Sequence, residues 1–192
     1  MSAYRIFSEM QKDGGGFDMQ PNEYTFGSLV PACCNVADSG LVLLQQMLSR
    51  VCKAGILEDL YVGSALVSGF ARVGLVDYAR KIFEQMGERN VVSTVSMNGL
   101  MVGLVRQKRG EEATRVFMEV KDLVGINIDS FVVLLSSFAE FSVLEEGKRR
   151  GREVHAYVTV SGLIHKKVAM ENGLVNMYAK CGAIDDACLA LQ

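Results

Sequence analysis

Residues 171–182 read ENGLVNMYAKCG, and they repeat the pattern of residues 63–74, which read GSALVSGFARVG. The shared pattern is L-V-x-x-[FY]-A-[KR]-x-G, and an aspartate and an alanine follow the glycine at the same distances in both copies. A glycine that ends one helix, with an acidic residue in the first turn of the next, is the usual form of a helix boundary. Each stretch therefore predicts the first helix and the turn of a helical hairpin.

A second pattern, A-x-x-[IV]-F-x-x-[MV], starts at Ala3, Ala79 and Ala113. Residues that recur at spacings of three, four and seven lie on one face of a helix, so each copy predicts an amphipathic helix. The leading helices share a leucine, and the five copies are 34 to 40 residues apart: Leu29, Leu66, Leu100, Leu134 and Leu174. An isolated hairpin of this size cannot bury its apolar face. The repeats therefore predict an all-α protein, a right-handed α-solenoid of stacked antiparallel helical hairpins.

The composition agrees with a folded helical chain of neutral charge balance. Of the 192 residues, 49% are hydrophobic and 22% are charged, which argues against intrinsic disorder. Only 2 prolines interrupt the chain, so long helices are permitted. Because 20 Lys and Arg face 22 Asp and Glu, the net charge is −2, and any contact with a nucleic acid must be local.

Several functional classes find no support in the sequence. The five cysteines form no CxxC pair, and their spacing predicts packed, reduced thiols with no metal site and no cofactor. We find no apolar run of the roughly 20 residues that a membrane span needs. Phosphate-binding GxxxxGK[ST], nucleophile-elbow GxSxG and zinc-deaminase motifs are all absent from the sequence. We therefore expect no enzyme, no membrane contact and no DNA binding.

At its repeated motifs the chain resembles the pentatricopeptide repeat family of plant organelles. Residues 172–182 resemble the short repeat variant, residues 25–33 the opening of the long variant, and residues 110–117 the standard unit. Residues 151–155, followed by 161–163, resemble the second helix of the long variant. The alternation of these variants is typical of the PLS subclass, in which standard, long and short repeats follow in order.

The resemblance divides the chain into six units of one repeat array. They are a truncated P-type repeat at 1–22, an L-type at 23–59, an S-type at 60–93, a P-type at 94–129, an L-type at 130–167 and a truncated S-type at 168–192. Because the first and last units are incomplete, we expect a fragment of a longer protein. About three extra residues near 91–97 and about two missing near 125–134 depart from the family pattern.

This resemblance implies sequence-specific binding of single-stranded organellar RNA, as part of a C-to-U editing specificity factor in the mitochondrion or chloroplast. Other proteins of an editing complex are further candidate partners, and the full-length protein could carry a C-terminal deaminase-like domain. The alternative is a protein–protein interaction scaffold of tetratricopeptide type. That family expects W-x-x-L-G-x-x-Y and a proline at the end of each unit. The chain has no Trp, and its prolines are Pro21 and Pro31, which disfavours the scaffold.

As the resemblance implies, the fifth residue of each first helix and the closing residue of each repeat read one RNA base. Short side chains such as Asn, Ser and Asp can donate to or accept from a base edge. The fifth positions are Gly27, Ser64, Asn98, Val132 and Asn172, and the closing positions are Asn22, Asp59, Asn90, Asp129 and Lys167. Ser64 with Asn90 resembles an adenine-reading pair, and Asn98 with Asp129 a uracil-reading pair. If Asn127 closes the repeat instead of Asp129, cytosine is equally expected.

Each of these residues also has a purely structural interpretation. An Asn or Asp at a helix start is often an N-cap. The basic clusters at 106–109, 148–152 and 166–167 could contact phosphate or could simply be solvated. His155 aligns with a family position on a packed helix, so a structural role is expected for it.

Overall fold

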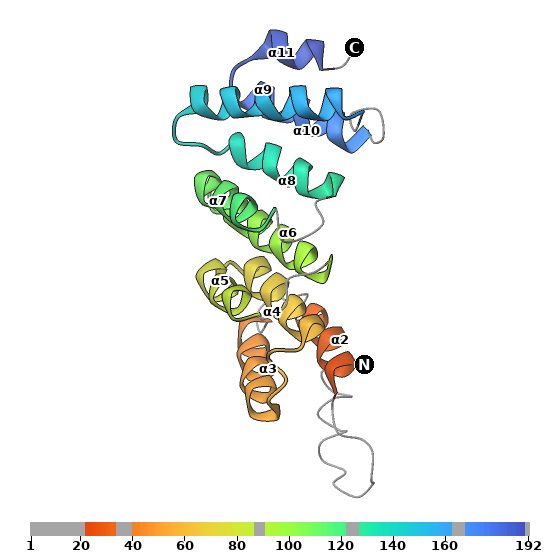
Figure 1. Ribbon diagram of the computed structural model, residues 1–192. Coiled ribbons are helices and arrows are strands. Elements are labelled where there is room, and N and C mark those ends of the chain that lie inside the picture. The colour runs from red at the N-terminus through yellow and green to blue at the C-terminus, as the bar shows by residue number, and fades with distance from the viewer. Residues whose placement is uncertain (1–21, 34–39, 87–90, 122–126, 163–167, 191–192) are drawn as a thin grey trace, which may run out of the picture. The chain divides into compact units, whose positions relative to one another are not determined.

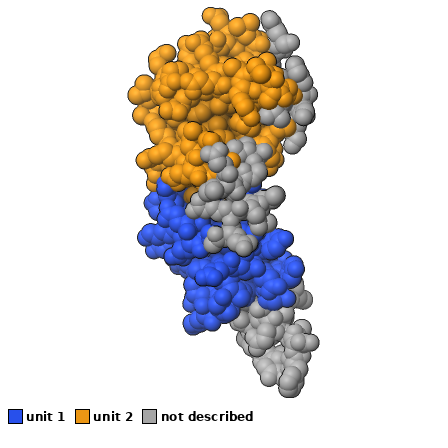
Figure 2. Space-filling model, in the orientation of Figure 1, with its two compact units in different colours: residues 1–96 blue, residues 97–192 orange. Residues whose placement is uncertain are grey.

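A computed structural model describes residues 22–33, 40–86, 91–121, 127–162 and 168–190 of the chain, except for the side chains of residues 91–93. Within these ranges the secondary structure consists of ten α-helices without a strand (Figure 1). None of the described helices is long and apolar enough to cross a membrane. The chain forms two compact units, residues 1–96 and residues 97–192, shown in different colours in Figure 2.

Unit 1 contains α2 (Glu23–Cys33), α3 (Gly40–Ala54), α4 (Leu60–Arg72) and α5 (Val76–Gln85). Helix α2 packs against α3 and α4, and α4 packs against α5, so two hairpins share one apolar core. Val30, Leu44, Met47, Leu66 and Phe70 are fully or almost fully buried in this core. Helix α6 (Val91–Arg106) begins in unit 1 and ends in unit 2.

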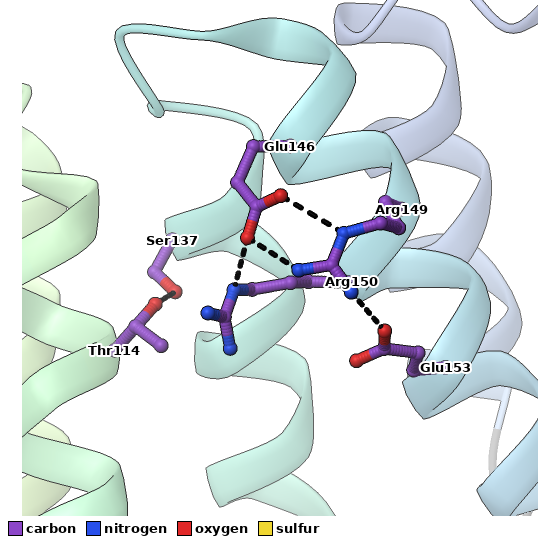
Figure 3. Close-up of polar contacts among 6 residues, drawn as sticks. All are labelled: Thr114, Ser137, Glu146, Arg149, Arg150 and Glu153. Atoms are coloured by element: carbon purple, nitrogen blue, oxygen red, sulfur yellow. Dashed lines mark hydrogen bonds and ion pairs between the residues drawn. The ribbon is translucent and has the colours of Figure 1, made fainter.

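Unit 2 contains α7 (Gly110–Val120), α8 (Ile128–Phe138), α9 (Leu144–Val160), α10 (Val168–Lys180) and α11 (Ile184–Leu189). Helix α8 contacts α7, α9 and α10, and α10 also contacts α9 and α11. The first helices of consecutive hairpins, α8 and α10, are therefore direct neighbours. The buried hydroxyls of Thr114 and Ser137, 2.9 Å apart, join α7 to α8 (Figure 3).

The repeated leucines are buried in all five first helices, α2, α4, α6, α8 and α10. The turns between helices carry the other repeated feature, since Gly74 and Gly182 have φ angles of 86° and 73°. This left-handed conformation is strained for residues that have a Cβ atom, and glycine adopts it readily. The structure confirms the predicted all-α fold of stacked helical hairpins, and the L-V-x-x-[FY]-A-[KR]-x-G pattern marks first helices and their turns.

Candidate nucleic-acid interface

Three of the predicted closing residues cap first helices. Asn22 Oδ1 accepts hydrogen bonds from the backbone N–H and the hydroxyl of Thr25, both at 3.0 Å, in front of α2. Asp59 Oδ1 accepts from two backbone N–H groups in the first turn of α4, each at 3.0 Å. Asn127 Oδ1 accepts from the N–H of Ser130 at 2.9 Å and from its hydroxyl at 3.0 Å. These positions thus have the capping role that their residue types favour.

The remaining closing positions lie elsewhere. Asp129 is an exposed residue in the first turn of α8, which begins at Ile128, directly after the N-cap Asn127. Asn90 and Lys167 lie outside the described residues. Asn127 therefore has the same place before its helix that Asn22 and Asp59 have before theirs.

Four of the predicted fifth residues are the fifth residue of a helix in the structure. They are Gly27 in α2, Ser64 in α4, Val132 in α8 and Asn172 in α10. Their exposure differs: Asn172 is exposed, Gly27 and Val132 are half-buried, and Ser64 is only 6% exposed. The structure thus aligns these positions on equivalent helices without making them equally accessible.

Asn98, predicted as a fifth residue, is the eighth residue of α6. This helix begins at Val91, so the three extra residues form part of its first turn. The buried Leu100 follows Asn98 by two residues, as Leu66 follows Ser64. Asn98 is half-buried, and its carbonyl oxygen Oδ1 is the one buried side-chain oxygen or nitrogen of the described residues that has no hydrogen-bond partner. A buried acceptor without a partner costs about 1–3 kcal/mol.

Exposed apolar side chains precede the fifth positions by one helical turn. Tyr24 precedes Gly27 and Tyr61 precedes Ser64, and these tyrosines are 70% and 59% exposed. Val95, which is 59% exposed, lies three residues before Asn98. Residues three apart lie on the same face of a helix. Gly27 and Ser64, the fifth positions of α2 and α4 in unit 1, therefore each have an exposed tyrosine one helical turn before them.

The basic cluster of α9 is largely neutralised by acidic neighbours (Figure 3). Arg149 donates hydrogen bonds to both carboxylate oxygens of Glu146, at 2.9 and 2.7 Å, and another to Glu153. Arg150 donates to Glu146 at 2.8 Å, and Arg152 pairs with Asp186 at 2.6 Å. The hydrogen bonds from Arg149 and Arg150 hold the pKa of Glu146 at about 2, well below its usual value. Arg149, Arg150 and Arg152 are therefore poorly placed to supply free positive charge to phosphates.

Lys108 and Arg109, in the cluster between α6 and α7, are paired as well. Lys108 Nζ lies 2.7 Å from a carboxylate oxygen of Glu140, and Arg109 binds both carboxylate oxygens of Glu112, at 2.7 and 2.8 Å. The sequence did not indicate the pair of Lys108 and Glu140, because 32 residues separate its members. Among the described residues, no group of three or more His, Cys, Asp or Glu side chains is arranged to hold a metal ion.

An apolar groove of about 410 Å³ lies between α7 and α9 in unit 2, with α8 as its floor. The ring centroid of Phe131 lies 6.0 Å from that of Phe117 and 5.7 Å from that of Tyr157. Arg150 and Glu153, which stand at this groove, are engaged in the ion pairs of α9. The second helices α7 and α9 form most of its lining, and neither Val132 of α8 nor Asn172 of α10 is among the lining residues.

Comparison with known proteins agrees with this repeat geometry. The family model described as PPR repeat matches residues 64–91 and 95–123, which include Ser64 and Asn98. An Arabidopsis thaliana protein named as a putative pentatricopeptide repeat-containing protein is 54% identical over 187 residues, which are 97% of this chain and 18% of the relative. The chain belongs to the pentatricopeptide repeat family.

Two further relatives from Arabidopsis thaliana have lower identity to this chain. A relative named as chloroplastic is 31% identical over 186 residues, 96% of this chain and 20% of the relative. A relative named as putative and mitochondrial is 30% identical over 186 residues, 96% of this chain and 27% of the relative. This pentatricopeptide repeat chain thus spans about a fifth of the length of the relatives it matches. The chain is therefore not assigned to the tetratricopeptide family, the alternative considered from the sequence.

Proposed function

We propose that this pentatricopeptide repeat chain binds single-stranded RNA in a sequence-specific manner, through the first helices of each unit. We further propose that it belongs to the PLS subclass and forms part of a plant organellar C-to-U editing specificity factor. Relatives named as chloroplastic and as mitochondrial support an organellar location. We attribute no chemical step to this chain, and a deaminase-like activity would belong to another part of the full-length protein.

The observation that carries the proposal is the unpaired carbonyl oxygen of Asn98. An acceptor that is buried without a partner is relieved when a ligand brings a donor. The Watson–Crick edges of uracil and cytosine offer the ring N3–H and the N4 amino group, respectively, and proteins read single-stranded RNA on these edges. Asn98 also has an amide N–H₂ that can donate to the O2 or N3 acceptors of a pyrimidine.

Exposed tyrosines add a second element of RNA binding. Unstacked bases of single-stranded RNA stack on aromatic side chains, and each such contact is worth about 1–3 kcal/mol. Tyr24 and Tyr61 are mostly exposed, and each lies one helical turn before a predicted reading position. We therefore assign stacking to these tyrosines and base-edge recognition to the polar fifth positions Ser64, Asn98 and Asn172.

The helix boundaries support Asn127 over Asp129 as the closing residue paired with Asn98. Asn127 directly precedes α8, as Asn22 precedes α2 and Asp59 precedes α4, whereas Asp129 is already inside α8. By the family resemblance, Asn98 with Asn127 includes cytosine among the preferred bases. For the repeat at 60–93, Ser64 with Asn90 remains the proposed adenine-reading pair, and Gly27 with Asp59 and the single residue Asn172 are further proposed contacts.

The test is competition binding with labelled single-stranded RNAs that differ at one base. Asn98→Ser should shift preference at one nucleotide from pyrimidine toward purine, by a factor equivalent to about 1–3 kcal/mol, the scale known for base readout in DNA. The matched control is Gln45→Ser, which removes an exposed amide from the second helix α3 and should leave the preference unchanged. Unchanged competition with Asn98→Ser would refute the role of Asn98. Failure of the unaltered chain to bind any RNA in the series would refute the proposed function.

A further inference from the structure

The turn between α8 and α9 is held by ion pairs from both neighbouring hairpins of unit 2. One carboxylate oxygen of Glu140, in this turn, lies 2.7 Å from Lys108 Nζ, in the turn between α6 and α7. The other oxygen lies 3.0 Å from Nζ of Lys180, the last residue of α10. A single carboxylate therefore joins three consecutive hairpins.

The backbone at the start of α7 packs closely against this turn. A Cβ atom added at Gly110, the first residue of α7, would lie 2.2 Å from the carbonyl oxygen of Ser137 and 2.9 Å from that of Glu140. The backbone N–H and the hydroxyl of Ser142 both donate to Glu111 Oε1, at 2.8 and 2.6 Å. The start of α7 thus packs against the turn that contains Glu140 and accepts hydrogen bonds from Ser142, two residues after it.

The three side chains differ in exposure, and the Glu140 carboxylate is the least exposed. The side chain of Glu140 is 10% exposed, whereas those of Lys108 and Lys180 are 75% and 47% exposed. The lysine hydrogen bonds lower the pKa of Glu140, although its burial acts in the opposite direction. If one lysine is removed, water takes its place and Glu140 keeps the other lysine as its counter-charge. If both lysines are removed, the shielded carboxylate of Glu140 has no counter-charge.

Lys108 reaches Glu140 from a backbone conformation that is costly for a lysine. Its φ angle is 62°, and it precedes the first residue of α7 by two residues, as Gly74 precedes that of α5 and Gly182 that of α11. A residue with a Cβ atom is strained in this conformation, which glycine adopts readily. The site therefore combines a strained turn with a long side chain directed at a neighbouring hairpin.

We propose that Glu140, Lys108 and Lys180 form a salt-sensitive clamp that fixes the three hairpins of unit 2 relative to one another. The clamp acts on α8 and α10, whose close packing is evident at Gly173, where an added Cβ atom would lie 3.3 Å from a methyl carbon of Leu135. These helices carry Val132 and Asn172 at their fifth positions. The clamp therefore sets the spacing of successive RNA contacts, a consequence that rests on the proposed function.

Native-state amide hydrogen exchange of the full chain tests the clamp without RNA. In Glu140→Gln, the amide of Phe141, bonded to the Phe138 carbonyl, and the amide of Ser142 should exchange about tenfold faster at low salt. High salt should bring the unaltered chain close to the variant, because ion pairs with exposed partners are screened. The control Glu84→Gln removes the exposed pair of Arg80 and Glu84 in unit 1 and should leave these two amides unchanged.

The single variants Lys108→Met and Lys180→Met guard against a folding defect in Glu140→Gln, because both lysines are exposed. Each should accelerate exchange less than Glu140→Gln does, and the double lysine variant should reach or exceed its effect. Exchange in Glu140→Gln and in the double lysine variant that matches the Glu84→Gln control would overturn the clamp.

A second arm measures the affinity of the same variants for an RNA bound by the unaltered chain. Glu140→Gln should weaken this affinity about threefold or more, with the difference lost in high salt. If the exchange result holds and affinity does not change, the clamp stands but does not set the RNA spacing. If the unaltered chain binds no RNA, the proposed function fails and the exchange result still decides the clamp.

Discussion

The ring nitrogen Nδ1 of His155 lies 3.0 Å from the hydroxyl oxygen of Tyr178, so that α9 and α10 share a polar contact at their packed interface. Tyr178 is almost fully buried, and burial raises its pKa to about 12. Burial also lowers the pKa of His155, an effect that the nearby Asp186 opposes. His155 is thus a neutral, packed histidine at pH 7, which agrees with the structural role expected from the sequence.

The burial of His155 predicts a loss of stability in mild acid. The pKa of His155 is lower in the folded chain than its ordinary 6.5, so the unfolded chain binds the proton more readily. The stability that the neutral, buried His155 contributes is fully present above pH 6.5 and is lost as the pH falls below that value. Urea unfolding should show this decrease between pH 7.5 and pH 5.5, and His155→Gln should reduce it. Tyr178→Phe keeps the burial of His155 and should retain the decrease, and a variant His155→Gln with the unaltered pH dependence would contradict the prediction.

The two glycines Gly110 and Gly27 should respond to alanine with opposite signs. A Cβ atom at Gly110 would meet the carbonyl oxygen of Ser137 at 2.2 Å, whereas one at Gly27, inside α2, would meet nothing within 4 Å. Gly110→Ala should lower the free energy of unfolding by about 2–3 kcal/mol, the cost of overpacking. Gly27→Ala should raise it by about 0.5–1 kcal/mol, because alanine loses less conformational freedom in a helix. Urea unfolding followed by circular dichroism measures both, and equal effects at the two sites would refute the close approach at Gly110.

The repeats made the hairpins and their turns predictable, because Gly74, Gly182 and the buried leucines each have a local physical role that recurs along the chain. The start of α6 was not predictable, because residues 91–97 contain no residue that stops a helix, and the extra residues could have formed a loop or a longer helix. Asn127 and Asp129 are both residue types that cap helices, so the sequence left the choice between them open. The clamp at Glu140 depends on residues 32 and 40 positions away, which no local pattern specifies.

Arg149 should have little part in the salt dependence of RNA binding. Its guanidinium is engaged with Glu146 and Glu153, and the bonds to Glu146 raise the pKa of Arg149. Each phosphate contact in a single strand contributes about 0.7 to the slope of log affinity against log salt concentration. We expect Arg149→Gln to leave this slope unchanged in fluorescence anisotropy titrations. A slope smaller by about 0.7 would show that Arg149 releases its carboxylates to bind a phosphate.

Glycine and methionine at position 108 should separate the strain of the turn from the charge of the clamp. Both changes remove the ion pair with Glu140, but only glycine adopts a φ of 62° without strain. Lys108→Gly should therefore be more stable than Lys108→Met by about 1 kcal/mol at any salt concentration. At low salt the unaltered chain should be close in stability to Lys108→Gly, because the ion pair offsets the strain. At 1 M salt the pair is screened, and Lys108→Gly should become the more stable of the two in urea unfolding. Equal stability of the glycine and methionine variants would show that residue 108 does not hold the left-handed conformation in solution.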